Sequence, residues 1–272
     1  MKKVLLLLLF IITLHIAYAQ QRNVDLFYEK KTNGWILYGY NKEYYPVSLT
    51  LNIDLTNMRF SEKFDKYLVI PPRTSKHKLG EFTAINTRAK YTFKYTYLYY
   101  PGDYNVKTYD QYYQYDLPFR KGKSVYIIQG YNGTFSHQGQ KSLDFALQEG
   151  DEILAARGGI VVQLVQNNNK NCGTKDCAEY NNYITIMHDD GTYASYLHLM
   201  YNGAVVKLGD KVEKSQLIAY SGNTGWSLGP HLHFMVYFRG LRIEDTIETG
   251  FRIDKGDKYS VLFEKYYYKR NY

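Results

Sequence analysis

Hydrophobic and polar residues alternate in short runs along most of this 272-residue chain, and turn residues separate the runs. The 31 tyrosines, with many threonines and valines, strengthen this pattern because aromatic and β-branched side chains favour strands. No long segment repeats its apolar positions with the 3.6-residue period of a helix. The chain is therefore predicted to be all-β.

Residues 20–122 predict an N-terminal antiparallel β domain of the sandwich type. Its alternating runs, with prolines and glycines beside them, are NGWILYGYN, PVSLTLNIDL, KYLVIPP and KYTFKYTYLYY. Nothing in this region suggests catalysis. His77 stands in the basic stretch RTSKHKLG, which we interpret as a turn with a solvated histidine.

Residues 123–247 predict a second unit, built as a compact antiparallel β-sheet. Glycines punctuate its apolar runs, and Asp190-Gly191 suits a tight hairpin turn that needs positive φ angles. Residues 248–272 form a C-terminal extension with the character of a strand and a basic aromatic tail. The sequence does not place this extension in the fold.

The chain begins with the features of a secretory signal peptide. Two lysines precede an apolar run that ends at Ala17-Tyr18-Ala19, so we expect cleavage near Ala19 and residues 1–19 to be removed. The alternative is an uncleaved N-terminal anchor. No later segment reaches the roughly 18 apolar residues of a membrane span. We therefore expect a soluble protein that is secreted, periplasmic or otherwise in the cell envelope.

The charge of the chain is basic. Loss of residues 1–19, which hold two lysines, lowers the formal net charge from +8 to +6. An exported basic protein suits an anionic polymer such as a cell wall or a membrane surface, although solubility alone also explains this charge.

The two cysteines, Cys172 and Cys177, lie in the polar stretch NNNKNCGTKDCAEYNN. Their number excludes a four-cysteine metal site, and their spacing excludes a C-x-x-C redox motif. In an oxidising compartment we expect a small disulfide that stabilises the loop by roughly 2 kcal/mol on the loop-entropy model. Two free thiols are the alternative.

Two of the 7 histidines stand one residue apart in GPHLHF. In a strand, His231 and His233 point to one face and Leu232 points to the other. Two imidazoles on one face can bind a metal, move a proton, or do one of each. An ordinary half-exposed strand is the plain alternative.

Other candidate ligands lie in the same unit: His137, His188 and His198, with Asp144 at the entry to an apolar run. A carboxylate leading into a buried strand needs a partner, and a dication supplies one. Two histidines and one carboxylate with an open position are what a catalytic zinc requires, and the remaining histidines suit proton transfer and oxyanion stabilisation. No H-E-x-x-H motif occurs. Either His231 or His233 fits the role of the ligand.

The ordered set His137…Asp144, YLHL, SGNTG and GPHLHF resembles the lysostaphin/LytM-type zinc metallopeptidases, which cut peptide bonds in bacterial peptidoglycan. The resemblance covers about residues 130–240. It implies one zinc ion bound by His137, Asp144 and His233, and a catalytic pair, His198 and His231, on a groove floored by antiparallel strands.

The sequence departs from the family pattern at two positions. Six residues, QGQKSL, separate His137 from Asp144 where three are usual, and Ser215 stands where a glycine is usual. We expect the longer loop still to return both side chains to one ion. We expect Ser215 to affect only the geometry of its turn.

Other residues near these motifs are interpreted as structural. His188 is expected to be a strand-end histidine, because the zinc set is complete without it. The glycines and the proline of SGNTG and GPHLHF are expected to shape the backbone, with no chemistry of their own: Gly222, Gly225, Gly229 and Pro230.

We therefore expect an exported zinc endopeptidase that acts as a monomer on peptidoglycan peptides and has no nucleic-acid partner. A non-catalytic cell-wall-binding or regulatory protein on the same scaffold is the first alternative. A non-haem iron oxygenase, which also uses two histidines and a carboxylate, is the second. Neither the peptide cross-link that is cut nor the role of the N-terminal domain is encoded in a readable motif.

Overall fold

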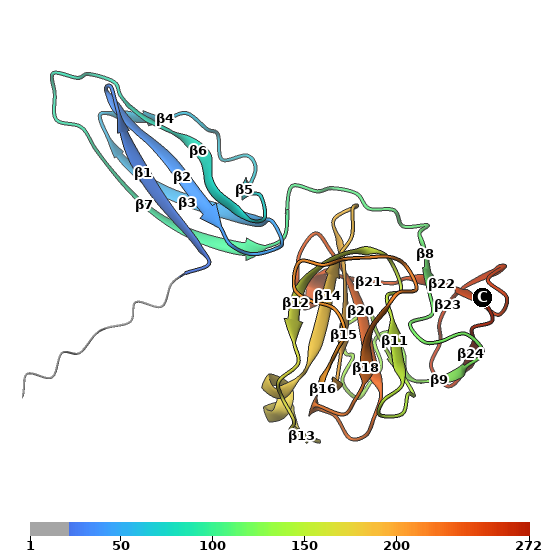
Figure 1. The fold of residues 1–272 in the computed structure, drawn as a ribbon. Coiled ribbons are helices and arrows are strands. Elements are labelled where there is room, and N and C mark those ends of the chain that lie inside the picture. The colour runs from blue at the N-terminus through green and yellow to red at the C-terminus, as the bar shows by residue number, and fades with distance from the viewer. Residues whose placement is uncertain (1–21) are drawn as a thin grey trace, which may run out of the picture.

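The computed structural model describes residues 22–272, so the expected signal peptide and its cleavage site near Ala19 lie outside the described residues. Across residues 22–272 the chain is built almost entirely from β-strands, as the alternating pattern predicts, and its two helices are short 3-10 turns. Figure 1 shows two units, an elongated sandwich and a larger C-terminal unit. No helix in the described part of the chain has the length and apolar character needed to cross a membrane.

The N-terminal unit is the expected antiparallel sandwich. One sheet has the order β1-β2-β6-β4 and the other the order β5-β3-β7, and all of their strand pairs are antiparallel. The strands are β1 (Val24–Lys31), β2 (Gly34–Asn41), β3 (Val47–Thr56), β4 (Met58–Phe60), β5 (Leu68–Ile70), β6 (Thr74–Ala84) and β7 (Thr92–Pro101). His77 lies within β6, so the prediction of a turn at RTSKHKLG is wrong. Its pairing opposite Gly39 on β2 explains the extended backbone.

The C-terminal unit is organised around a nine-stranded antiparallel sheet with the order β17-β12-β14-β15-β20-β10-β9-β24, and β21 also pairs with β20. Its strands are β9 (Ser124–Gln129), β10 (Ser142–Phe145), β12 (Gly159–Val165), β14 (Tyr183–Met187), β15 (Thr192–Leu197), β17 (Lys211–Val212), β20 (Leu232–Phe238), β21 (Thr246–Ile247) and β24 (Tyr267–Lys269). Between β14 and β15, Gly191 takes φ 80°, whereas Asp190 has no positive φ, so only the glycine of the predicted Asp190-Gly191 turn has the expected conformation.

Smaller elements complete this unit. A three-stranded sheet has the order β11-β18-β16, a second has the order β23-β22-β8, and β13 pairs with β19. Their bounds are β8 (Gln114–Asp116), β11 (Glu152–Leu154), β13 (Asn171–Cys172), η1 (Lys175–Tyr180), β16 (Leu199–Ala204), β18 (Leu217–Ser221), β19 (Gly225–Trp226), η2 (Ile243–Asp245), β22 (Gly250–Ile253) and β23 (Lys258–Val261).

The C-terminal extension is part of this unit. Strand β24 pairs with β9, and β22 runs parallel to β8. The end of the chain therefore packs beside the strand that leads into the loop carrying His137.

Alternation along β20 separates the core from a second face of the large sheet. Leu232, Phe234 and Val236 belong to the core of the C-terminal unit, whereas Met235 and Tyr237 belong to a cluster shared with the N-terminal sandwich. His233 lies between Leu232 and Phe234, so it points to the face of Met235. The side chain of His233 therefore lies on the face of the sheet that points away from the core of the C-terminal unit.

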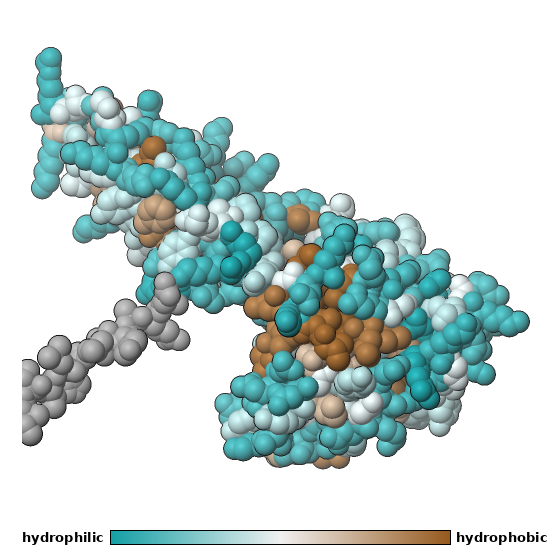
Figure 2. All heavy atoms as spheres, in the orientation of Figure 1, coloured by the Kyte–Doolittle hydropathy of each residue, from teal (hydrophilic) through white to brown (hydrophobic). Residues whose placement is uncertain are grey.

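The sandwich contacts the C-terminal unit through buried apolar side chains. The shared cluster includes Val47 and Tyr45 from the sandwich and Val162 and Tyr193 from the large sheet. On the visible face of the molecule, apolar residues gather on the C-terminal unit, while the sandwich surface is mostly polar (Figure 2).

Candidate metal centre and its histidine pair

Three of the predicted site residues come together at one end of the large sheet. Asp144 on β10 and His233 on β20 are directly opposed cross-strand partners, and Asp144 Oδ1 lies 2.9 Å from His233 Nδ1. His137 Nε2 lies 3.1 Å from the same nitrogen and 3.3 Å from Asp144 Oδ2. Each of the three side chains offers one nitrogen or oxygen atom as a ligand, and these three atoms all lie within 4.8 Å of one another.

The loop before β10 aims His137 at this group. The ring Nδ1 lies 2.9 Å from the carbonyl oxygen of Gly130, and the side chain is fully buried. If Nδ1 carries the proton, it donates to that carbonyl and leaves the Nε2 lone pair facing Asp144 and His233. The carbonyl of Gly130 thus selects the nitrogen available to a ligand.

The long spacer between His137 and Asp144 folds back on itself. The amide of Gln140 donates to the carbonyl of His137 at 2.8 Å, and Gly139 takes φ 71°. The amide of Asn132 donates to the carbonyl of Gln140 at 2.8 Å, which closes the loop. This turn brings His137 beside Asp144, although six residues separate them.

Gln129, at the end of β9, braces the carboxylate and the loop. Its Nε2 donates to Asp144 Oδ2 at 3.2 Å and to Ser136 Oγ at 2.8 Å. Its Oε1 accepts the backbone N–H groups of Phe135 and Ser136, each at 3.0 Å. Sequence reasoning gave Gln129 no role, because its importance depends on the pairing of β9 with β10.

Burial and mutual hydrogen bonding shift the pKa values within the group of three. Burial raises the pKa of Asp144, but hydrogen bonds from His137 and His233 outweigh it and hold the pKa well below its usual value. Burial lowers the pKa of His233. Burial also opposes protonation of His137, yet the bond to Asp144 raises its pKa. The carboxylate therefore stays ionised in a site with little access to water.

His198 and His231 lie beside this group. Their ring centroids are 4.5 Å apart, and the His198 ring is 5.9 Å from that of His233. His231 Nε2 lies 3.7 Å from Asp144 Oδ1. All five predicted residues thus occupy one site, even though they are spread from position 137 to position 233.

Backbone carbonyls orient both rings of the pair. His198 Nδ1 lies 2.7 Å from the carbonyl oxygen of Thr224, and His231 Nδ1 lies 2.8 Å from that of Gly229. If both Nδ1 atoms are protonated, Nε2 is the atom of each ring that can accept a proton. His198 also takes φ 61°, an unusual conformation for a residue other than glycine and one that is concentrated at functional sites.

Burial, with the neighbouring imidazoles of His231 and His233, lowers the pKa of His198 to about 3. The His198 ring is therefore neutral near pH 7. A neutral, buried imidazole with a fixed Nδ1 bond has one free lone pair, which can accept a hydrogen bond from a water molecule.

His188 is not part of the site. His188 precedes β15 and His198 follows it. The six residues of this strand, at roughly 3.3 Å per residue, separate the two histidines by about 20 Å. His188 Nδ1 lies 2.8 Å from the carbonyl oxygen of Gly158, and its Nε2 is buried without a hydrogen-bond partner. Burial lowers its pKa to about 3.

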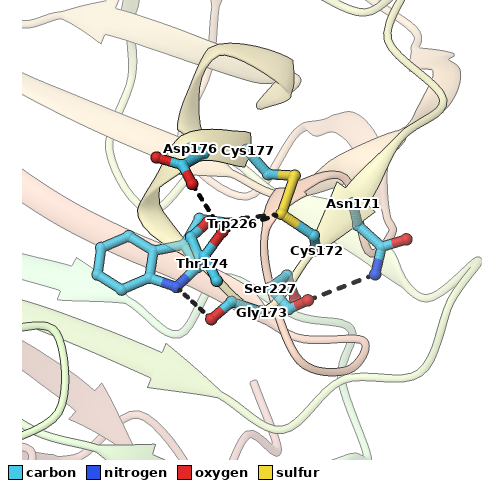
Figure 3. The surroundings of a disulfide bond; sticks show 8 residues. All are labelled: Asn171, Cys172, Gly173, Thr174, Asp176, Cys177, Trp226 and Ser227. Carbon is cyan, nitrogen blue, oxygen red and sulfur yellow. Dashed lines mark hydrogen bonds between the residues drawn. A yellow bond between two sulfur atoms is a disulfide. The ribbon is translucent and has the colours of Figure 1, made fainter.

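The expected disulfide between Cys172 and Cys177 is present, so the prediction of a small covalent loop is confirmed. Figure 3 shows it beside Trp226, whose Nε1 donates to the carbonyl of Gly173 at 3.2 Å. The segment that carries Trp226 leads directly into His231.

The expectation that Ser215 affects only its turn is wrong. Ser215 takes φ 71°, as a glycine position would, but its hydroxyl also lies 2.5 Å from Asp116 Oδ2 and accepts a bond from Arg270 at 2.6 Å. Arg270 belongs to the C-terminal extension, which the sequence could not place. Ser215 therefore ties its turn to the end of the chain.

Comparison with known proteins gives one family. Residues 138–245 match the model of peptidase family M23. The match begins one residue after His137 and includes Asp144, His198, His231 and His233.

Similar proteins carry related descriptions. An uncharacterized metalloprotease of Buchnera aphidicola is 39% identical over 101 residues, which are 37% of this chain and 23% of that protein. The peptidoglycan DD-endopeptidase ShyA of Vibrio cholerae is 36% identical over 97 residues, covering 36% of this chain and 20% of that protein. Lysostaphin of Staphylococcus staphylolyticus is 36% identical over 94 residues, which are 34% of this chain and 17% of that protein. The matched segment thus spans about a fifth of the length of each relative.

Proposed function

We propose that this chain, whose residues 138–245 match the model of peptidase family M23, is an exported zinc-dependent endopeptidase that hydrolyses peptide cross-links of bacterial peptidoglycan. The observation that carries the proposal is the convergence of His137, Asp144 and His233 within 4.8 Å, with two further histidines beside them. The descriptions of ShyA and lysostaphin support the choice of substrate.

The donor set fits a zinc ion. Imidazole nitrogens and a carboxylate oxygen are zinc ligands, and three protein ligands are typical of a catalytic site. His137 Nε2 and His233 Nδ1 face each other at 3.1 Å beside an ionised carboxylate, an arrangement in which a dication satisfies all three groups. We assign His137, Asp144 and His233 as the ligands.

A bound zinc ion would act as a Lewis acid and make water nucleophilic near neutral pH. The protein supplies the proton transfer. We assign it to His198 and His231, because each has its Nδ1 held at a backbone carbonyl and its Nε2 free. A ring that has taken the proton of the attacking water can donate a hydrogen bond to the developing oxyanion and then protonate the leaving amine.

Two further features support the boundaries and the location that we propose. Residues 123–247 and 248–272 act as one catalytic unit, because β24 extends the large sheet at β9 and β22 pairs with β8. We place the end of the separate β domain before β8 (Gln114–Asp116) and not at residue 122, because β8 pairs with β22 and because Leu117 and Phe119 belong to the core of the C-terminal unit. The disulfide favours an oxidising compartment and hence export, with residues 1–19 as the signal peptide.

The test is digestion of purified cell walls by the protein from residue 20 onward. We expect one zinc ion per chain and new amine and carboxyl termini in the released peptides, identified by mass. His233→Ala is the matched control and should release none. A protein that retains zinc but releases no peptide from walls of several chemotypes would contradict the proposal and favour a binding protein on this scaffold.

A further inference from the structure

The disulfide closes residues 172–177, in which every residue except the two half-buried cysteines is exposed; together with Asn171 before it, we call this segment the disulfide loop. Its residues are mostly polar, and η1, which begins inside the loop, buries none of its side chains. A segment without buried apolar side chains has little to hold it in one conformation except a covalent link or local hydrogen bonds. The disulfide is the covalent link that holds this loop, and hydrogen bonds such as that from the Cys177 amide to the Thr174 carbonyl at 3.1 Å act beside it.

The disulfide loop supports a second segment, residues 223–231, which we call the histidine loop. Strand β13 runs parallel to β19, with Asn171 opposite Gly225 and Cys172 opposite Trp226. The amide of Ser227 donates to the carbonyl of Cys172 at 3.1 Å. Figure 3 shows two further bonds between these segments, from the Trp226 indole to the Gly173 carbonyl at 3.2 Å and from the Asn171 amide side chain to the Ser227 carbonyl at 3.4 Å.

The histidine loop in turn orients both members of the histidine pair. Its Thr224 carbonyl holds His198 Nδ1 at 2.7 Å. Ser227 Oγ lies 3.3 Å from His231 Nδ1 and donates to the carbonyl of Gly229, the same oxygen that the His231 ring contacts. Thr224 and Ser227 directly flank β19 (Gly225–Trp226), and Gly229 follows it by three residues.

The proposed metal ligands are held by different elements. Asp144 and His233 are fixed by the pairing of β10 with β20, and His137 by the carbonyl of Gly130. The histidine loop thus contacts both members of the histidine pair, and it also meets the loop of His137, where the rings of Trp226 and Phe135 lie 6.3 Å apart.

We propose that the disulfide loop is a positioning device for catalysis. The Cys172–Cys177 bond fixes β13, β13 fixes β19, and the residues on either side of β19 hold His198 and His231 in the orientation needed for proton transfer. This inference rests on the proposed function. It makes a specific prediction, because loss of the disulfide should lower turnover and leave metal binding intact.

The kinetic test compares the oxidised protein, the protein reduced with a phosphine, and the Cys172→Ser/Cys177→Ser variant. The substrate is the cross-linked muropeptide that the oxidised protein cleaves. We expect kcat to fall roughly 10- to 100-fold in both disulfide-free forms, because small misplacements of catalytic groups cost this much. We expect KM to change less than about twofold, because the substrate contacts stay in place. Zinc content should remain one ion per chain.

Two controls separate this effect from others. Lys175→Ala changes an exposed side chain of the same loop, keeps the disulfide, and should leave kcat unchanged. Adding the phosphine to the double-serine variant should have no further effect, which excludes removal of zinc by the reductant. Circular dichroism confirms that the variant is folded, and the reduced wild-type protein provides the same comparison if the variant does not fold.

A second readout does not depend on activity. In zinc-free protein, imidazole-directed proton–nitrogen NMR should show a hydrogen-bonded Nδ1–H for His198 in the oxidised form, identified by its absence in His198→Ala. The signal should broaden or shift after reduction. Equal kcat values with an unchanged signal would overturn the inference, and so would loss of zinc together with activity. If the oxidised protein cleaves no wall peptide, the proposed function fails, and the NMR comparison still decides the positioning role.

Discussion

Asp144 and His233 face each other across β10 and β20, and the Oδ1 of one lies 2.9 Å from the Nδ1 of the other. Directly opposed residues of an antiparallel pair point to the same face of the sheet. A register slip by one residue would therefore turn one of the two side chains into the apolar core. The strand register, more than the loops, sets the geometry of the proposed metal centre.

Asp144→Asn should weaken zinc binding without disrupting the sheet. The amide keeps the shape of the carboxylate but removes the negative charge, so we expect affinity to fall by about 100-fold or more. Competition against a chelator measures the affinity. Asp54→Asn, at an exposed position of β3, is the matched control and should bind zinc as the wild type does. An unchanged affinity in Asp144→Asn would exclude this carboxylate as a ligand.

His198→Ala should separate metal binding from turnover. The ring lies next to the proposed ligands and is held by the Thr224 carbonyl. Its loss should keep one zinc ion per chain and lower kcat by about 10²- to 10⁴-fold, the usual contribution of a general acid or base. Metal analysis and peptide release from cell walls check both parts. Full activity of this variant would refute the proton-transfer role.

His188→Gln should make the stability of the fold less sensitive to acid. Burial lowers the pKa of His188 to about 3 in the folded state, whereas the unfolded value is near 6.5. The unfolded chain therefore binds a proton in this window that the folded chain does not, and stability falls as the pH drops from about 6.5 towards 3. Glutamine should reduce the slope of unfolding free energy against pH by up to about 1.4 kcal/mol per unit. Urea unfolding at pH 7, 6, 5 and 4 tests this, and equal slopes would contradict it.

Asp116→Ala should strongly destabilise the C-terminal unit. The carboxylate is 1% exposed, lies 2.6 Å from Arg252 Nη2, and accepts the hydroxyl of Ser215, which also binds Arg270. Its removal leaves the buried guanidinium of Arg270 and the half-buried one of Arg252 without their anion, a change that costs about 3–5 kcal/mol. Urea unfolding measures the loss. Asp54→Ala, in the exposed position on β3, should stay within about 0.5 kcal/mol of the wild type.

The sequence determined the all-β class, the sandwich followed by a larger sheet, and the residue types of the candidate site. These follow from short-range properties: a period of two along strands such as β20, turn residues between runs, and histidines at strand ends. The five predicted site residues do meet in space, and their catalytic roles are what the experiments above test.

Only the tertiary structure decided which groups support that site. Gln129 braces Asp144 because β9 pairs with β10, and Thr224 orients His198 through a backbone carbonyl, an atom that every residue type carries. Ser215 binds Arg270, which lies 55 positions away. Such contacts depend on register and on chain reversal over long separations, and a local pattern of side chains carries no record of either.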